Sequence, residues 1–139
     1  MQRAFARGMA CILVVDDFED TRSLYAALLR SRGHDVLEAG DGEAALRIAG
    51  AELPDVIVMD LSLPVLDGRD AIEALRLDGL TSHIPIVVVS GDASARTELQ
   101  ARGIDVEAFL PKPCRHDTLV SRIEKLVGPS PLHAFARVG

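Results

Sequence analysis

Five short apolar runs, separated by stretches with helical spacing, constrain the fold of this 139-residue chain more than any other feature. The first, third and fourth runs are nearly continuous Val, Ile and Leu, as in strands that are covered on both faces of a parallel sheet. Parallel strands need long crossover connections, which intervening helices supply. The pattern predicts an α/β fold, a doubly wound five-stranded parallel sheet with five helices. The strands are expected at residues 11–16, 35–39, 55–60, 85–90 and 106–110.

Helices are expected at residues 18–32, 43–49, 69–77, 94–102 and 117–127. In the first of them Leu24, Ala27, Leu28 and Ser31 share helical spacing. A glycine follows each helix and is expected to end it, because glycine suits the position just past a helix terminus. These residues are Gly33, Gly50, Gly79, Gly103 and Gly128. The second and fifth strands, DVLEA and VEAFL, are short and mixed, as at the edges of a sheet.

The length favours one compact domain at residues 11–127, with an amino-terminal extension at 1–10 and a tail or linker stub at 128–139. A net charge of −6 argues against a nucleic-acid or anionic-membrane surface, since both need a basic footprint. The sequence has no apolar signal-peptide core and no run long enough to span a membrane. We therefore expect a cytoplasmic protein that contacts neither nucleic acid nor membrane directly.

Polar residues suited to phosphoryl chemistry stand where four of the apolar runs end. They are Asp16 and Asp17, Asp60, Ser90 and Lys112. In an open parallel sheet, ligands bind beyond the carboxyl ends of the strands, so these residues are expected to become neighbours. Taken singly, each has an ordinary interpretation: the acids and the serine as caps, the lysine as a surface residue. Their recurrence at equivalent places predicts one polar site.

The three acids would repel one another, at about 4 kcal/mol for each pair 4 Å apart at an effective dielectric constant near 20. A hard divalent cation, Mg²⁺ or Mn²⁺, would offset this repulsion and prefers such oxygen ligands. Asp60 could act as a nucleophile and form an acyl phosphate. Ser90 could donate a hydrogen bond to a phosphoryl oxygen. Lys112 lies between two prolines, and a cis bond before Pro113 would aim it inward.

In this order, the strand-end residues resemble the receiver domain of two-component response regulators over residues 11–127. The resemblance implies a flavodoxin-like fold with strand order 2-1-3-4-5. It identifies Asp60 as the phosphoacceptor and the cation ligands as Asp16, Asp17, Asp60 and the backbone carbonyl of Ser62. Pro64 and Asp67-Gly68 match the signature that follows the phosphoacceptor, and Ser90 and Lys112 match the phosphate-binding positions. Phe109 matches the aromatic switch, and Ser62 and Asp92 lie where the family tunes its rates.

The resemblance also implies partners: a sensor histidine kinase or histidine phosphotransfer protein as donor, and a downstream protein on the face of the fourth helix, fifth strand and fifth helix. A phosphorylation-dependent homodimer is a further implication. The domain would not be an enzyme beyond its own phosphorylation and autodephosphorylation. The departures are small: Ser90 is the less common hydroxyl residue, Leu63 replaces a frequent Met, and Cys114 replaces an apolar residue.

Two alternatives remain. A pseudo-receiver that only binds proteins would usually lack an acid or the lysine. A phosphatase of the haloacid-dehalogenase type would need Asp-x-Asp on the first strand, whereas Phe18 stands two residues after Asp16. The four histidines show no metal-ligand spacing and are expected at the surface: His34, His83, His116 and His133.

Overall fold

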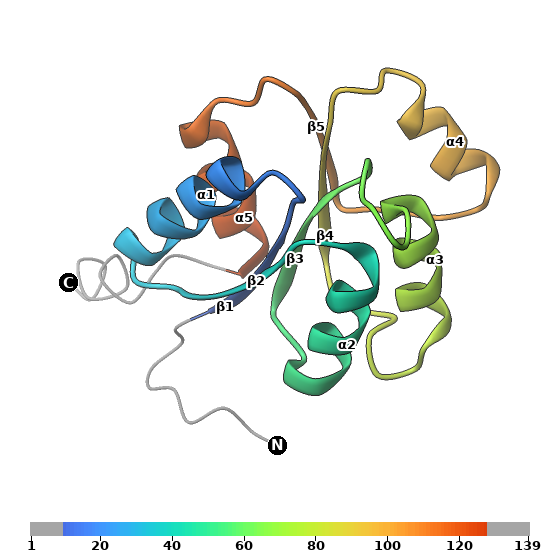
Figure 1. The fold of residues 1–139 in the computed structure, drawn as a ribbon, viewed down its shortest axis with the longest axis horizontal. Coiled ribbons are helices and arrows are strands. Elements are labelled where there is room, and N and C mark those ends of the chain that lie inside the picture. Colours follow the sequence, from blue (N-terminus) through green and yellow to red (C-terminus); the bar gives the residue numbers. More distant parts are fainter. Residues whose placement is uncertain (1–9, 128–139) are drawn as a thin grey trace.

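The computed structural model describes residues 10–127 and alternates five strands with five helices (Figure 1). The strands are β1 Cys11–Val15, β2 Asp35–Ala39, β3 Val56–Asp60, β4 Ile86–Ser90 and β5 Ala108–Pro111. The helices are α1 Glu19–Ser31, α2 Gly42–Glu52, α3 Gly68–Leu77, α4 Ala95–Ala101 and α5 His116–Val127. The expected tail lies outside the described residues, as does the extension apart from Ala10, which is buried.

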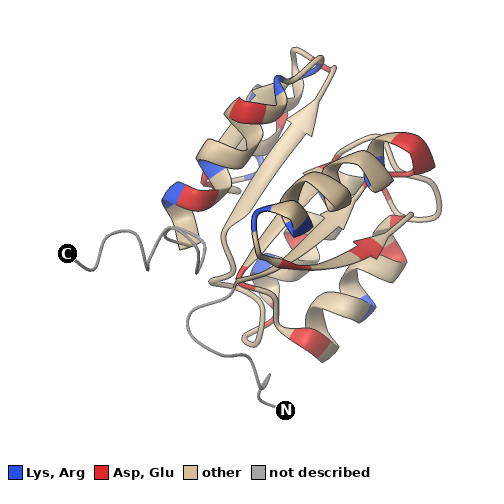
Figure 2. Ribbon diagram, turned by 90° about the vertical axis from the view of Figure 1, so that its left-hand side faces the viewer, with Lys and Arg blue, Asp and Glu red and all other residues tan. Residues whose placement is uncertain are grey.

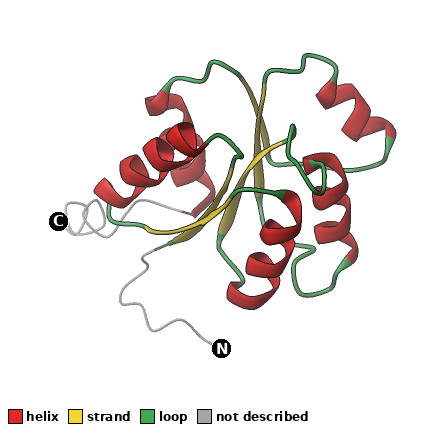
Figure 3. Cartoon of the chain, viewed as in Figure 1, coloured by secondary structure: helices red, strands yellow, loops and turns green. Residues whose placement is uncertain are grey.

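The strands form one parallel sheet in the order β2-β1-β3-β4-β5. Figure 3 shows helices, in red, on both sides of the strands, in yellow. This order confirms the expected doubly wound α/β fold and places the two mixed strands at the edges of the sheet. Residues of β1, β3 and β4 are all buried, because helices cover both faces. Within residues 10–127 the helices are all too short or too polar to cross a membrane.

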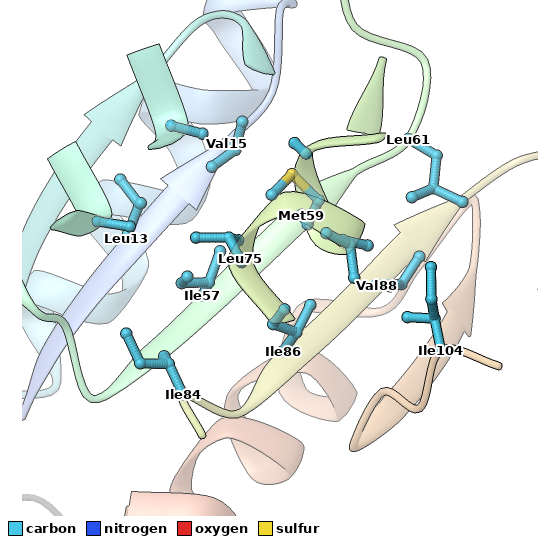
Figure 4. Close-up of a cluster of buried hydrophobic side chains, with 14 of the residues drawn as sticks. Leu13, Val15, Ile57, Met59, Leu61, Leu75, Ile84, Ile86, Val88 and Ile104 are labelled. Atoms are coloured by element: carbon cyan, nitrogen blue, oxygen red, sulfur yellow. The ribbon is translucent and has the colours of Figure 1, made fainter. Parts of the chain in front are cut away.

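Alternate residues of the central strands pack into two separate apolar layers. On one face, residues such as Leu13, Ile57 and Val88 pack with α2, α3 and α4 (Figure 4). On the other face, residues such as Val14 and Val87 pack with α1 and α5. The side-chain period of two along a strand produces this division. Both layers end near the carboxyl ends of the strands, where the polar residues begin.

The buried face of α1 differs from the positions that share the expected spacing. Leu24 is 48% exposed, whereas Tyr25, Ala26 and Leu29 are buried against the sheet. The apolar positions expected from the helical spacing are therefore shifted by about one residue from the face that is buried. The helix could satisfy either set by periodicity, and the fit of the large Tyr25 and Leu29 side chains against the strands decides between them.

Two element boundaries differ by two residues or more from the expected ones, and other boundaries differ by a single residue. Gly50 does not end α2, which continues to Glu52 and stops where Leu53 adopts a left-handed conformation with φ of 48°. Gly33, by contrast, follows α1 with φ of 93°, as expected of a glycine past a helix end. Strand β5 starts two residues late, at Ala108, and the Glu107 side chain just before it accepts a hydrogen bond from the backbone N–H of Ile86.

One of the expected surface histidines is buried. The side chain of His34 is 0% exposed, and its Nε2 lies 3.1 Å from Glu124 on α5. Arg32 binds the other oxygen of the same carboxylate at 2.7 Å. His83 and His116 are exposed as expected, and His133 lies outside the described residues. Figure 2 shows both acidic and basic segments on the helices.

Candidate functional site

The carboxyl ends of four strands deliver the expected polar residues to one edge of the sheet. Asp16 directly follows β1, Asp60 ends β3, Ser90 ends β4 and Lys112 directly follows β5. The backbone N–H of Lys112 donates to the carbonyl of Ser90 at 2.9 Å, which fixes the two connections side by side. Residues far apart in the sequence thus become neighbours because their strands are adjacent and parallel.

Three carboxylates lie together at this edge. Asp16, Asp17 and Asp60 each offer an oxygen atom, and these atoms lie within 4.8 Å of one another. Asp16 and Asp60 are buried, whereas Asp17 is exposed at the mouth of the site. Such a set of hard oxygen ligands, open on one side, suits a divalent cation that keeps some of its waters.

Lys112 already contributes one positive charge to the acidic group. Its Nζ lies 3.2 Å from Oδ2 of Asp60 and 3.5 Å from Oδ2 of Asp16. The Lys112–Pro113 peptide bond is cis, and the side chain points toward the acids. Burial alone would lower the pKa of Lys112, but the carboxylates of Asp60 and Asp16 outweigh burial and raise it. The lysine is therefore held in its charged form.

The carboxylate of Asp60 is not fully compensated by its neighbours. Burial raises the pKa of Asp60, and the nearby Asp16 charge raises it further, whereas Lys112 and the backbone N–H of Ser62 act in the opposite direction. The net direction is upward. The site thus holds a carboxylate that would gain from additional positive charge.

The loop after β3 keeps Asp60 in place through short-range contacts. The backbone N–H of Ser62 donates to Oδ1 of Asp60 at 3.2 Å. Asp67 caps α3 by accepting from the backbone N–H of Arg69 at 2.9 Å. A Cβ atom on Gly68 would collide with the backbone of Asp60 and Leu61. Asp67-Gly68 is therefore the start of helix α3, packed closely onto the site.

The hydroxyl of Ser90 is engaged next to the acids. Its Oγ accepts a hydrogen bond from the backbone N–H of Asp92 at 3.0 Å. The Asp92 carboxylate in turn accepts from the backbone N–H of Ser94 and from Arg69. Phe109 is the second residue of β5 and is half-buried, and the Arg96 guanidinium lies 5.9 Å from the centre of its ring. The expected switch residues thus occupy two adjacent strands.

Comparison with known proteins identifies the family of this chain. Residues 12–124 match the family model of the response regulator receiver domain. The chain belongs to this family. The receiver domain is 33% identical to protein PilH of Pseudomonas aeruginosa, over 86% of this chain and 98% of that protein. It is also 33% identical to the chemotaxis protein CheY of the same organism, over 83% of this chain and 94% of that protein.

Other relatives are longer than this receiver domain. The response regulator PleD of Caulobacter vibrioides is 35% identical over 84% of this chain, which spans only 26% of PleD. Among solved structures, the receiver domain of the Pseudomonas aeruginosa sensor histidine kinase PA1611 matches with a TM-score of 0.77 and 29% identity, covering 86% of this chain and 98% of that one. That structure is described with a magnesium ion coordinated in its active-site cleft.

One residue beside the site was not anticipated from the sequence. Arg69, in the first turn of α3, reaches the β4–α4 loop and binds Asp92 at 2.7 Å and Glu98 at 3.2 Å. A cation is disfavoured at the amino end of a helix by the helix dipole. That conflict was the available signal, and it indicates partners outside the helix.

Proposed function

We propose that this receiver domain accepts a phosphoryl group on Asp60 and so switches a partner-binding face. The observation that supports this most is the position of the Asp60 carboxylate. Asp60 ends a buried strand, and its carboxylate lies between Lys112 and two other acids. A rigid strand presents the nucleophile, and the surrounding charges are suited to a transferring phosphoryl group.

The same residues fit a divalent cation. Asp17 and Asp60 would hold Mg²⁺ or Mn²⁺ directly, with the backbone carbonyl of Ser62, and Asp16 would act mostly through water. The raised pKa of Asp60 supports this assignment, because burial leaves its negative charge short of compensation. When bound, the cation supplies charge neutralisation for the oxygens of the transferring group.

In the proposed transfer, an Asp60 oxygen attacks the phosphorus of a phosphohistidine in line. A new P–O bond forms as the P–N bond breaks, and the departing histidine nitrogen keeps the electron pair. Lys112 exchanges its contact with Asp60 for one with a phosphoryl oxygen, a charge-assisted hydrogen bond. Water later cleaves the acyl phosphate, and Ser62 and Asp92 are placed to influence that rate. The domain acts once on itself and turns over no separate substrate.

The proposed switch runs from Ser90 to Phe109. When the Ser90 hydroxyl turns toward a phosphoryl group, it leaves space into which Phe109 can move from its present place near Arg96. This would alter the face formed by α4, β5 and α5, on which a downstream protein or a second copy of the chain would bind. A shift between two populations suffices for this effect.

Apolar side chains around the site offer a docking surface for the histidine donor. Phe18 is 60% exposed, Leu24 48% and Val65 75%. Val65 has φ of 68°, which is strained for a β-branched residue and is often associated with function. A groove of about 460 Å³ runs beside Lys112 and is lined by Leu24 and other residues of α1 and the β5–α5 loop. These features suit the apolar surface of a histidine kinase or phosphotransfer helix bundle.

The proposal is tested with acetyl phosphate and Mg²⁺ by mass spectrometry of the intact chain. We expect one base-labile phosphoryl group on the wild type and none on Asp60→Asn. Asp20→Asn, which changes an exposed acid of α1, serves as the matched control and should label like the wild type. Equal labelling of Asp60→Asn would contradict the assignment and favour another acceptor, whereas an unlabelled wild type would favour a pseudo-receiver.

A further inference from the structure

Helix α4 is held beside the site by little apolar surface. It has seven residues, and only Ala95 and Leu99 are buried. The neighbouring α3 has ten residues and buries three apolar side chains, of which Ile72 and Leu75 are large. Because burial of apolar side chains is the main source of attachment for a surface helix, α4 must depend more on other contacts.

Arginines supply these contacts in both directions between α3 and α4. Arg69 of α3 binds Asp92, before α4, and Glu98 within it. Arg102, which follows α4, binds two acids of α3, Asp70 at 2.9 Å and Glu73 at 3.1 Å. We call this group of ion pairs the α3–α4 clasp; it consists of Arg69, Asp70, Glu73, Asp92, Glu98 and Arg102.

Arg69 is the more enclosed of the two arginines. Its side chain is 13% exposed, against 37% for Arg102. Besides Asp92 and Glu98, it binds Asp67, the residue that caps its own helix, at 3.2 Å. A guanidinium that is largely shielded from water and shared by three carboxylates is held more firmly than one in an isolated surface pair.

The clasp is connected to the hydroxyl of Ser90 by consecutive hydrogen bonds. The backbone N–H of Asp92 donates to Ser90 Oγ, and Oδ2 of Asp92 accepts from Arg69 at 2.7 Å. Oδ1 of Asp92 accepts from both the backbone N–H and the hydroxyl of Ser94, at the start of α4. If Ser90 Oγ turns toward Asp60, the bond from Asp92 is lost and the segment that Arg69 holds must adjust.

We propose that Arg69 is a positioning residue that sets the balance of the switch. Together with Arg102, it stabilises the arrangement in which Ser90 Oγ bonds to Asp92, and it does so through contacts that the alternative arrangement gives up. A group can shift such an equilibrium only through contacts that differ between the two states. This inference rests on the proposed phosphorylation of Asp60 and specifies how its threshold is set.

The test compares Arg69→Met with the wild type, with Arg32→Met as the matched control. Arg32→Met removes the same charge from an ion pair with Glu124 on the other face of the sheet. The first measurement is backbone hydrogen exchange over residues 91–102, without any phosphoryl mimic. We expect exchange there to be about fivefold faster in Arg69→Met and unchanged in Arg32→Met. A fivefold change corresponds to a loss of about 1 kcal/mol in the free energy that opposes local opening of this segment.

The second measurement is binding of beryllofluoride, a mimic of a phosphoryl group on a carboxylate, with Mg²⁺ present. We expect the apparent Kd to fall about fivefold in Arg69→Met, because less free energy opposes the switch. Arg69→Lys, which keeps the charge but loses the planar fork, should lie between the two. If Arg69→Met does not fold, Glu98→Gln, whose side chain is about half exposed, should show the same changes on a smaller scale.

The outcomes separate this inference from the proposed function. Exchange and affinity both equal to the wild type in folded Arg69→Met would overturn the role of the clasp, even if Asp60 is phosphorylated. Faster exchange with unchanged affinity would also overturn it, since the clasp would then be only structural. A wild-type chain that binds no beryllofluoride would count against phosphorylation of Asp60, while the exchange data would still show whether Arg69 holds α4.

Discussion

Helices α4 and α5, which lie on opposite faces of the sheet, are attached in different ways. On one face, α5 has twelve residues and buries Leu119, Val120 and Ile123. Its Glu124 also binds the buried His34. On the other face, α4 has seven residues with two buried side chains, and charged residues near the surface hold it. Buried apolar side chains hold α5, whereas ion pairs near the surface contribute much of what holds α4.

This difference suits the proposed switch, in which one surface changes and the rest is kept. Ion pairs between partly exposed groups contribute little free energy, so they can break without unfolding the chain. Segments that move are drawn from the least stable parts of a fold. The site lies at the edge shared by both faces, where Asp60 ends a central strand and Ser90 starts the connection to α4.

The largest expected effect comes from truncating the apolar contact of each helix. Leu119 on α5 and Leu99 on α4 are both buried. We expect Leu119→Ala to lower the free energy of unfolding by about 3 kcal/mol and Leu99→Ala by about 2 kcal/mol, because the short α4 can settle into the space. Urea denaturation measures both values. A loss for Leu99→Ala as large as that for Leu119→Ala would show that α4 is as firmly packed as α5.

Substitutions in the ion pairs are expected to lower the free energy of unfolding by less than Leu119→Ala does. Loss of the Glu124 carboxylate, which binds Arg32 and His34, should cost more than loss of an acid of the clasp. Burial would raise the pKa of Glu124, but hydrogen bonds from Arg32 and then His34 outweigh it, so the pKa is lowered. A carboxyl with a lowered pKa in the folded state stabilises above its unfolded value and loses that contribution as pH falls through its folded pKa. Glu124→Gln should therefore lower the free energy of unfolding by about 2 kcal/mol at pH 7.

The pH series provides the check on this prediction. The deficit of Glu124→Gln should be constant above about pH 6 and should shrink as the pH falls below the unfolded value near 4.5. Glu73→Gln, in the exposed part of the clasp, should cost less than about 1 kcal/mol. Equal costs for the two substitutions would remove the distinction between the two faces.

The fold and the convergence of the site could be predicted from the sequence because both depend on strand order. Buried parallel strands have a recognisable composition, and their carboxyl ends meet wherever the sheet is doubly wound. The mixed DVLEA and VEAFL runs also gave the edges of the sheet correctly. These inferences needed no side-chain packing.

Features that depend on side-chain packing could not be predicted. The buried face of α1 is set by how Tyr25 fits against the sheet. The buried His34 has its partner in Glu124 of α5, which lies far away in the sequence. The close contact of Gly68 with the backbone of Asp60 follows from the path of the β3–α3 loop. Arg69 has its partners on the next helix, a contact that local sequence does not specify. Such pairs arise only once the elements are placed.

The last expected effect concerns the Asp60 carboxylate, in the site between the two faces. The pKa of Asp60 is raised, chiefly by burial, so the folded state favours its protonated form. A group with a raised folded pKa contributes its stability below the unfolded value and loses it as pH rises through the folded pKa. At pH 7 the ionised Asp60 is therefore a cost, and Asp60→Asn should raise the free energy of unfolding in the absence of a divalent cation.

At pH 3, below both pKa values, wild type and Asp60→Asn should have nearly equal free energies of unfolding. Addition of Mg²⁺ at pH 7 should stabilise the wild type but not Asp60→Asn, because the cation compensates the carboxylate. Hydrogen exchange should locate the gain in the central strands, which both faces share. A gain confined to α4 would instead mean that the Asp60 charge acts mainly on the clasp, and the two faces would then differ in electrostatics as well as in packing.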